Sequence, residues 1–215
     1  IQMAVKANHD ISSGLDTAFI NSAINSNLAY RPEFVSNDYT QGKKVSVAIE
    51  RELRHCDAFY ISVAFITEGG LAPLKQVLAE LRDKGIPGKI LTTSYLTFTE
   101  PKALKTLADL SNVEVRVYDS TDEGASGFHT KGYIFKEEEI YRFIVESSNM
   151  TASAFSVNKE WNTKLVSTSD GELLKQMMTE FNALWNNEHT YAVEDFIEDY
   201  EVRYKLIKEQ KKNAA

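Results

Sequence analysis

The sequence predicts an α/β protein with a mixed, mostly parallel sheet flanked by helices on both faces. Strand-like and helix-like segments alternate from residue 58 to residue 118, the order that builds a parallel sheet. After residue 130, two strand-like runs are separated only by a short acidic turn, which predicts an antiparallel hairpin. The 215 residues suffice for one good core. We therefore expect one domain over residues 1–190, followed by a C-terminal helix in residues 191–215.

Helices are predicted where apolar residues recur every three or four positions. One such segment carries Pro101 in its first turn, and another ends at a basic turn followed by Gly85, both typical of helix ends. Pro32 and Asn37 interrupt the periodicity between the first two helices and predict a loop. The expected helices are residues 12–27, 43–55, 71–84, 99–110, 170–185 and 193–212.

Strands are predicted from apolar runs of suitable length. The run from Ala58 to Ile66 is almost unbroken in apolar and aromatic residues, which is typical of a strand covered on both faces. The run from Val113 to Tyr118 alternates instead, as expected of a half-buried strand. The expected strands are residues 58–66, 90–93, 113–118, 130–135, 141–145 and 163–167.

Composition narrows the possible functions. The formal net charge of −7 and the pI near 5.2 argue against a surface that wraps nucleic acid through bulk electrostatics, so any such contact must be local or helped by another domain. No apolar run approaches the length of a membrane span and no secretory signal is recognisable, which makes a cytoplasmic protein the expectation. The single cysteine, Cys56, excludes an internal disulfide and is expected to be a buried apolar residue.

Polar residues able to grip and attack a phosphodiester gather between residues 128 and 162. His129 and Lys131 lie at the start of one expected strand, Asn149 follows the next, and Glu160 opens a third. Adjacent antiparallel strands can bring Asn149 beside the His129–Lys131 pair. A His-x-Lys pair alone is weak evidence, because lysine is common and the chain has four histidines. The companion residues are what favour a functional site.

These residues stand in three motifs: Phe128-His129-Thr130-Lys131-Gly132-Tyr133-Ile134-Phe135, Ser147-Ser148-Asn149-Met150-Thr151 and Glu160-Trp161-Asn162. Together they resemble the phospholipase D-like superfamily, and more closely its single-motif nuclease branch. The resemblance is greatest to the phospholipase D-like domain at the N-terminus of bacterial superfamily 2 (DEAD/DEAH-type) helicases. It covers roughly residues 40 to 190. It implies an α/β/α sandwich whose C-terminal helix leads to a helicase domain, which would hold the nucleotide-binding site.

The resemblance also implies a mechanism. His129 would attack phosphorus and form a phosphohistidine intermediate, with Glu160 accepting the other ring N–H. Lys131 and Asn149 would donate to the non-bridging oxygens, where charge gathers in the transition state. The residues expected to contact the substrate are Thr130, Ser147 and Ser148. No metal and no other cofactor is expected, and the implied partner is nucleic acid, DNA in particular.

A second histidine must protonate the leaving oxygen, and in this superfamily it comes from a second copy of the motif. None of His9, His55 and His189 has a lysine two residues on, so the chain contains one copy. The resemblance therefore implies a homodimer whose two-fold axis places His129 of each chain on opposite sides of one phosphate.

Two departures from the family pattern keep other functions open. Lys136 stands where the fuller motif has an aspartate, and Glu146 stands where a glycine usually opens the serine-rich turn. Both favour the alternative of a catalytically degenerate nucleic-acid-binding or dimerisation module of a helicase. A lipid-processing phospholipase is disfavoured, because the chain has one motif and no basic amphipathic helix suited to a membrane surface.

Overall fold

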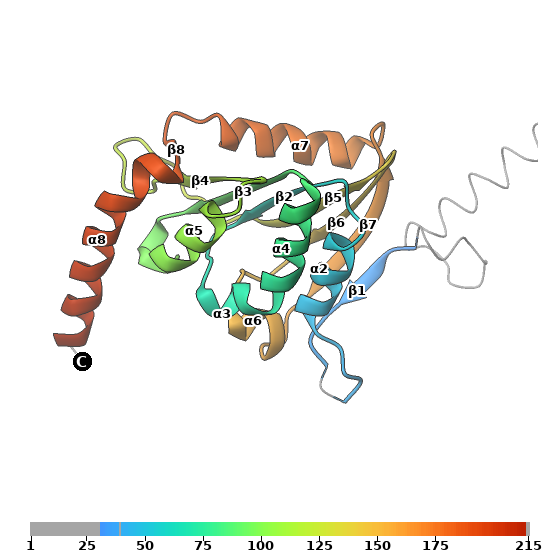
Figure 1. Cartoon of the computed structure of the whole chain (residues 1–215), viewed down its shortest axis with the longest axis horizontal. Helices are drawn as coiled ribbons and strands as arrows, with labels where there is room; N and C mark the ends of the chain where they lie inside the picture. The colour runs from blue at the N-terminus through green and yellow to red at the C-terminus, as the bar shows by residue number, and fades with distance from the viewer. Residues whose placement is uncertain (1–30, 39, 214–215) are drawn as a thin grey trace, which may run out of the picture.

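A computed structural model describes residues 31–38 and 40–213 (Figure 1). The helix expected over residues 12–27 lies outside the described residues. Within them the chain forms an eight-stranded sheet in the order β1-β7-β6-β5-β2-β3-β4-β8. The strands are β1 (Glu33–Val35), β2 (Ala58–Val63), β3 (Gly88–Thr93), β4 (Val113–Tyr118), β5 (Lys131–Glu137), β6 (Ile140–Val145), β7 (Asn162–Thr168) and β8 (Thr190–Ala192).

The α/β class with a mixed sheet is confirmed, but the expectation of a mostly parallel sheet is wrong. Among the described strands only β2–β3 and β3–β4 pair in parallel, and the other five neighbouring pairs are antiparallel. A parallel pair needs a long crossover, which the helices after β2 and β3 supply. A tight turn joins β5 to β6, and the short edge strands β1 and β8 also pair antiparallel. The alternation of strands and helices in the sequence therefore predicted correctly only the parallel pairing of β2, β3 and β4.

Helices cover both faces of the sheet, as expected. The described helix α7 alone packs on one face, and the other helices pack on the opposite face or beside β4 (Figure 1). The helices are α2 (Val45–Leu53), α3 (Glu68–Leu71), α4 (Lys75–Lys84), α5 (Pro101–Ala108), α6 (Ala152–Ser156), α7 (Glu172–Trp185) and α8 (Val193–Asn213), with short 3₁₀ turns η2 (Ala72–Leu74) and η3 (Tyr95–Thr97).

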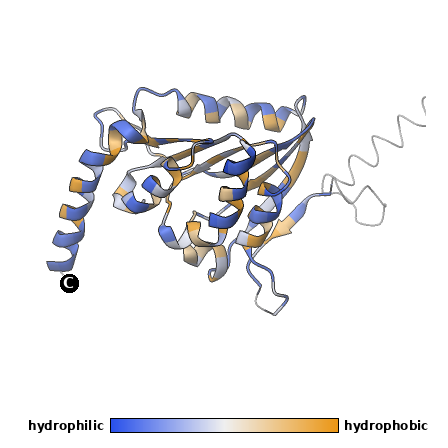
Figure 2. Cartoon of the chain, viewed as in Figure 1, coloured by the Kyte–Doolittle hydropathy of each residue, from blue (hydrophilic) through white to orange (hydrophobic). Residues whose placement is uncertain are grey.

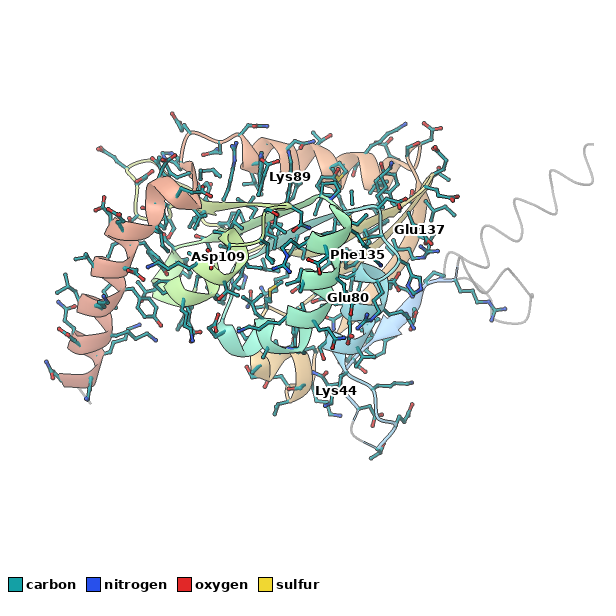
Figure 3. The ribbon with its side chains drawn as sticks, in the orientation of Figure 1. Lys44, Glu80, Lys89, Asp109, Phe135 and Glu137 are labelled. Atoms are coloured by element: carbon teal, nitrogen blue, oxygen red, sulfur yellow. The ribbon has the colours of Figure 1, made fainter. Side chains whose placement is uncertain are left out.

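The main core lies between the sheet and the helices α2, α4, α5, α6 and α8. Apolar residues of these helices belong to the buried core, and the helix ribbons alternate between hydrophobic and hydrophilic residues (Figure 2). Phe135 is buried within this layer, whereas Lys44 and Asp109 lie at the surface (Figure 3). Two smaller clusters, one built around Leu91 and Trp185 and one around Ile134 and Leu174, fill the space under α7. The sheet is thus covered on both faces along most of its length.

Two edge strands and one short helix differ from the predicted pattern. The segment expected as a loop around Pro32 contains β1, and β8 and α6 lie in segments for which no element was expected. The expected boundary at residue 190 falls at the start of β8, which pairs with β4. Beyond it, Val193, Phe196 and Tyr200 belong to the main core. The first turns of the C-terminal helix therefore complete the sheet domain.

None of the helices between residues 31 and 213, leaving out residue 39, combines the length and apolarity that a membrane crossing requires.

Candidate active site

The C-terminal ends of β2 and β6 lie beside the N-terminal ends of β5 and β7, at one end of the strands, which we call this edge of the sheet. The expected site residues lie in or next to the segments that enter or leave these strands here. Lys131 at the start of β5 pairs with Val63 at the end of β2. Val145 at the end of β6 pairs with Gly132 and Thr163. The segments that carry His129, the serine-rich turn and Glu160 therefore leave the sheet at the same edge. The strand register therefore brings the three sequence motifs to the same edge of the sheet.

His129 and Lys131 are in direct contact. The Nζ atom of Lys131 lies 2.9 Å from Nδ1 of His129 and 3.5 Å from Nε2. A charged lysine can only donate, so in this contact a neutral imidazole accepts through its unprotonated nitrogen. Burial lowers the pKa of Lys131, and the negative charge of Glu160 acts in the opposite direction. The imidazole itself is exposed to solvent and open to a ligand.

An aromatic contact helps to hold the imidazole, and the sequence interpretation missed it. The ring of Phe65 meets the ring of His129 edge-on at a centroid distance of 5.9 Å, and Phe98 packs edge-on against Phe65 at 4.9 Å. Phe65 lies just beyond β2, in the apolar run that was interpreted only as a strand. The apolar pattern of this segment does not indicate that the Phe65 ring would contact His129.

Asn149 is fixed by the chain that extends β2. Its Oδ1 accepts from the backbone N–H of Phe65 at 3.2 Å. The next residue, Met150, donates its N–H to the carbonyl of Phe65 and accepts from the N–H of Thr67, both at 3.0 Å. Among the described residues, no acceptor engages the Nδ2 of Asn149. The amide is therefore oriented with two donors available for an anionic ligand.

The buried Asn162 shapes the serine-rich turn. Its Oδ1 accepts from the backbone N–H of Ser147 at 3.1 Å and from the hydroxyl of Ser148 at 3.0 Å, and its Nδ2 donates to the carbonyl of Val35 at 3.0 Å. Ser148 is fully buried and its hydroxyl is engaged in this contact, so it shapes the turn and is not presented to a substrate. The sequence placed Asn162 in a motif without giving it a role.

Glu160 is tied to the same turn. It accepts from the hydroxyl of Ser147 in a short hydrogen bond and from Nδ2 of Asn158 at 3.4 Å. In the described part of the chain no hydrogen bond joins Glu160 to His129. The imidazole nitrogens contact the ammonium group of Lys131 instead. Thr130 also has a defined partner, since its hydroxyl lies 2.6 Å from that of Ser62.

Glu146 lies at this edge as a buried acid. Both of its carboxylate oxygens are buried and have no hydrogen-bond partner among the described residues, although part of the residue reaches the surface. Burial raises the pKa of Glu146 well above its ordinary value, and the charge of Glu160 raises it further. The hydroxyl of Tyr133 is buried nearby, also without a partner, and burial raises its pKa as well. The environment of Glu146 thus favours the neutral acid, which adds no negative charge beside a phosphate.

Lys136, the second departure from the family pattern, lies away from this edge. It is five residues further along β5 than Lys131, a separation of about 17 Å in an extended strand. There it pairs with Ala58 and Tyr141, at the opposite end of the hairpin. Lys136 is therefore separated from His129, Lys131 and Asn149 by the length of the strand.

The other described histidines lie elsewhere. Nδ1 of His55 contacts the carbonyl of Arg51 at 2.8 Å, and Nδ1 of His189 contacts Asp122 at 3.2 Å. Within residues 31–38 and 40–213, no three His, Cys, Asp or Glu side chains are grouped so as to hold a metal ion. The described site therefore offers one imidazole, one ammonium, one amide and one accessible carboxylate.

Comparisons with known proteins identify the family and the fold. The sequence model of a family described as "Cardiolipin synthase, PLD-like domain" matches residues 55–185. No curated protein sequence matches the chain.

Solved structures share the fold at low sequence identity. Nuc from Salmonella typhimurium, a phospholipase D family member, has a TM-score of 0.56 and 15% identity, covering 75% of this chain and 98% of its own. NucT from Helicobacter pylori has a TM-score of 0.57 and 14% identity, covering 76% of this chain and 99% of its own. The phosphatidylserine synthase of Haemophilus influenzae Rd KW20 has a TM-score of 0.58 and 14% identity, covering 91% of this chain and 48% of its own.

Proposed function

Because this chain belongs to the PLD-like domain family, we propose that it is a metal-independent phosphodiesterase that cleaves nucleic acid, DNA in particular, through a phosphohistidine intermediate. The observation that carries the proposal is the 2.9 Å contact between Lys131 Nζ and His129 Nδ1, with an oriented Asn149 at the same edge of the sheet. This set combines a nucleophile with two groups that can donate to phosphate oxygens.

The first chemical step begins when a phosphodiester draws Lys131 away from the ring. Lys131 then donates to a non-bridging oxygen together with Nδ2 of Asn149, and the lone pair of His129 Nδ1 is released. That nitrogen attacks phosphorus, the N–P bond forms, and the bond from phosphorus to the leaving oxygen breaks. Glu160 accepts the N–H at the other ring nitrogen and stabilises the charge that develops on the imidazole.

The leaving oxygen takes its proton from a second histidine, supplied by His129 of another copy of this chain. In the second step that histidine, now neutral, accepts a proton from water as the water oxygen attacks phosphorus. The P–N bond breaks, and both histidines return to their starting forms. The domain accordingly acts as a homodimer with one shared site.

The chain is proposed to work in the cytoplasm as the N-terminal module of a helicase. The support is the resemblance carried by its three motifs, and the direct check is an ATPase and strand-separation assay on the full-length gene product. If the full-length product shows neither activity, the proposed helicase role is wrong, while the proposed phosphodiesterase activity is not affected by that result.

The second candidate is a catalytically degenerate module that binds nucleic acid or joins two copies. Two observations favour it: Glu160 is bonded to Ser147 and Asn158 and not to His129, and the Lys131 ammonium lies against the imidazole that would have to attack. Such a site could still grip a phosphate through Lys131 and Asn149.

Cleavage of a labelled oligonucleotide in excess EDTA separates the two candidates. The native chain, a His129→Ala variant and a His55→Ala control are compared at equal concentration. The phosphodiesterase proposal expects cleavage that survives chelation, persists in His55→Ala and is lost in His129→Ala. Equal background cleavage in all three would leave only the binding module.

A further inference from the structure

A row of paired residues crosses five strands beside the site. Phe34 pairs with Thr163, Thr163 with Val145, Val145 with Gly132, and Gly132 with Ser62. Side chains of directly paired residues point to the same face of a sheet. Two residues further along β5 from Gly132, the side chain of Ile134 packs against Leu174 of α7, so the row lies on the α7 face.

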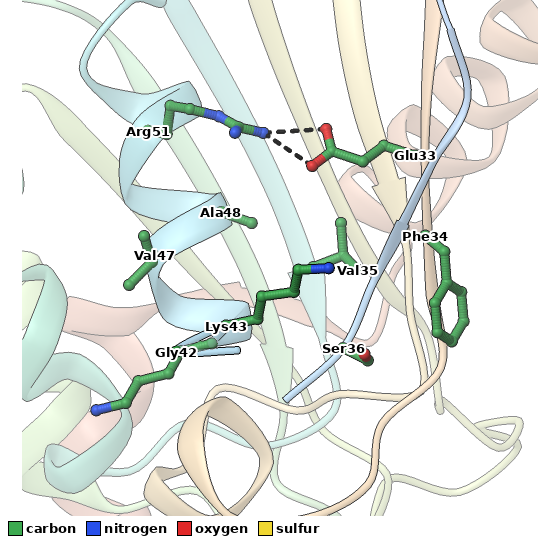
Figure 4. Close-up of a pocket in the computed structure, with 10 residues that line it drawn as sticks. Glu33, Phe34, Val35, Ser36, Gly42, Lys43, Val47, Ala48 and Arg51 are labelled. Carbon is green, nitrogen blue, oxygen red and sulfur yellow. Dashed lines mark hydrogen bonds and ion pairs between the residues drawn. The ribbon is translucent and has the colours of Figure 1, made fainter. Parts of the chain in front are cut away.

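The outer part of this row is not covered by α7. Phe34 is 61% exposed and Val145 is 45% exposed. Phe34 is among the residues that line the pocket between β1 and α2, and its ring lies on the side of β1 away from α2 (Figure 4). Trp161, two residues before Thr163, is 78% exposed and meets the ring of Phe34 edge-on at a centroid distance of 6.0 Å. We call Phe34, Trp161, Val145 and Gly132 the exposed strip.

The exposed strip is physically joined to the proposed active site at two points. The backbone N–H of Trp161 donates to the hydroxyl of Ser147 at 3.1 Å, and that hydroxyl donates to Glu160. At the inner end, Val145 and Gly132 line a cavity of about 350 Å³ under α7 that also reaches Thr130 and Lys131. The Lys131 side chain points to the opposite face from Gly132 by strand alternation, but Lys131 lies at the start of β5 and also lines this cavity. A ligand whose phosphate lies at Lys131 can therefore reach an apolar, partly aromatic surface around the ends of the strands.

We infer that the exposed strip binds the bases of single-stranded nucleic acid next to the scissile phosphate, with Trp161 as the stacking residue. This inference rests on the proposed function and names its substrate class as a single strand with accessible bases. Unpaired bases have exposed faces that stack on aromatic rings irrespective of sequence, whereas the bases of a duplex are already stacked on one another.

The shape and setting of the strip favour bases over other occupants. A ring that is mostly exposed at a sheet edge offers a flat face, which suits a base better than an acyl chain that needs an enclosed apolar tunnel. The inner cavity is lined in part by the polar residues Ser62, Gln176 and Glu180, which suits an acyl chain poorly. A second copy of the chain would need a broader apolar surface than this narrow strip provides.

The two tryptophans of the chain allow a direct test. Trp185 is 3% exposed and stacked on Phe181, so only Trp161 can meet a ligand among the tryptophans. An oligothymidylate of about ten nucleotides is titrated into a His129→Ala background, which prevents cleavage during the measurement. We expect quenching of tryptophan emission, and loss of that quenching in the His129→Ala, Trp161→Phe double variant.

Affinity is measured separately by the anisotropy of the labelled oligonucleotide in the same background. Trp161→Ala is expected to weaken binding about tenfold, while Trp161→Phe stays within about threefold because a phenyl ring still stacks. Val202→Ala removes an apolar side chain on α8 that is 60% exposed and is expected to leave the affinity unchanged.

Unchanged affinity in Trp161→Ala, together with unquenched emission, would overturn the inference. Quenching by a short-chain phosphatidylcholine dispersion and not by the oligonucleotide would also overturn it. So would a dimer that Trp161→Ala converts to monomers in sedimentation without any change in affinity for the oligonucleotide.

If His129-dependent cleavage of methyl p-nitrophenyl phosphate persists in Trp161→Ala while oligonucleotide binding is unaffected, only the inference about Trp161 fails. If no diester is cleaved but Trp161 still governs binding, the proposed catalysis fails and the stacking surface stands.

Discussion

The backbone N–H of Glu146 donates to the carbonyl of Lys131 at 3.0 Å, which holds the backbone of a buried acid beside that of the site lysine. This pairing continues the ladder between β5 and β6 past its last paired residues. It makes Glu146 part of the environment of the site, although its carboxyl group is turned into the protein. Its titration therefore gives a prediction about stability.

Glu146→Gln should change how stability depends on pH. The folded-state pKa of Glu146 is raised, so its contribution is fully present below the unfolded-state pKa near 4.5 and is lost as pH rises through the folded-state pKa. The free energy of unfolding of the native chain should therefore fall, relative to the glutamine variant, by up to about 1.4 kcal/mol per pH unit above that lower limit. Urea unfolding at several pH values measures this, with the exposed Glu139→Gln as control. Parallel curves for the native chain and Glu146→Gln would refute it.

Asn162→Ala should destabilise the fold and disorder the serine-rich turn. The substitution removes the partners of Ser147 N–H, the Ser148 hydroxyl and the Val35 carbonyl at a buried position. Each buried group left without a partner costs about 1–3 kcal/mol, so a loss of about 3 kcal/mol is expected in urea unfolding. Asn158→Ala, at an exposed position in the same connection, should cost under about 0.5 kcal/mol. A loss of the same size in both variants would contradict the role given to Asn162.

Lys131→Met and Lys136→Met should differ in their effect on activity, although both residues belong to β5. Removing the Lys131 ammonium takes away a donor to the non-bridging oxygens, so kcat/KM for a diester should fall by about 100-fold or more. Lys136 lies at the other end of the strand, so its variant should retain native activity. The measurement is diester cleavage by both variants after unfolding curves have matched their stability. Loss of activity in Lys136→Met would place a second functional group outside the proposed site.

Gly70→Ala should be far more damaging than Gly69→Ala. A Cβ at Gly70 would lie 2.0 Å from the carbonyl oxygen of Met150, the residue after Asn149, whereas one at Gly69 would lie 3.1 Å from the Cβ of Ala152. The backbone of α3 must therefore move away from the turn that positions Asn149. We expect a loss of about 3 kcal/mol for Gly70→Ala and about 1 kcal/mol or less for Gly69→Ala in urea unfolding. Equal stability of the two variants would show that this close approach is unimportant.

The central strands and the hairpin could be predicted because their signals are local. β4 alternates along its own length and was predicted with its observed bounds, and β5 and β6 are separated only by an acidic turn. The edge strands β1 and β8 could not be predicted, since three residues carry too short a pattern. Their pairing partners, β7 and β4, also lie far away in the sequence.

The same distinction applies to the site. The His129–Lys131 contact joins residues two positions apart and could be predicted from a motif. Asn149 is oriented by the backbone of Phe65, 84 positions away in the sequence, and Asn162 holds Val35, 127 positions away, so neither contact leaves a local pattern. The burial of Glu146 could not be foreseen either, because a glutamate at a strand end is normally expected to face solvent.

The central claim is that His129 forms a covalent bond to phosphorus. The most direct measurement is mass spectrometry of the chain after reaction with an oligonucleotide in EDTA, with an alkaline denaturing quench that preserves an acid-labile phosphoramidate. The account predicts a nucleotide adduct on the peptide that contains His129, absent from His129→Ala and present in His55→Ala. Cleavage by the native chain without any adduct, or undiminished cleavage by His129→Ala, would contradict it.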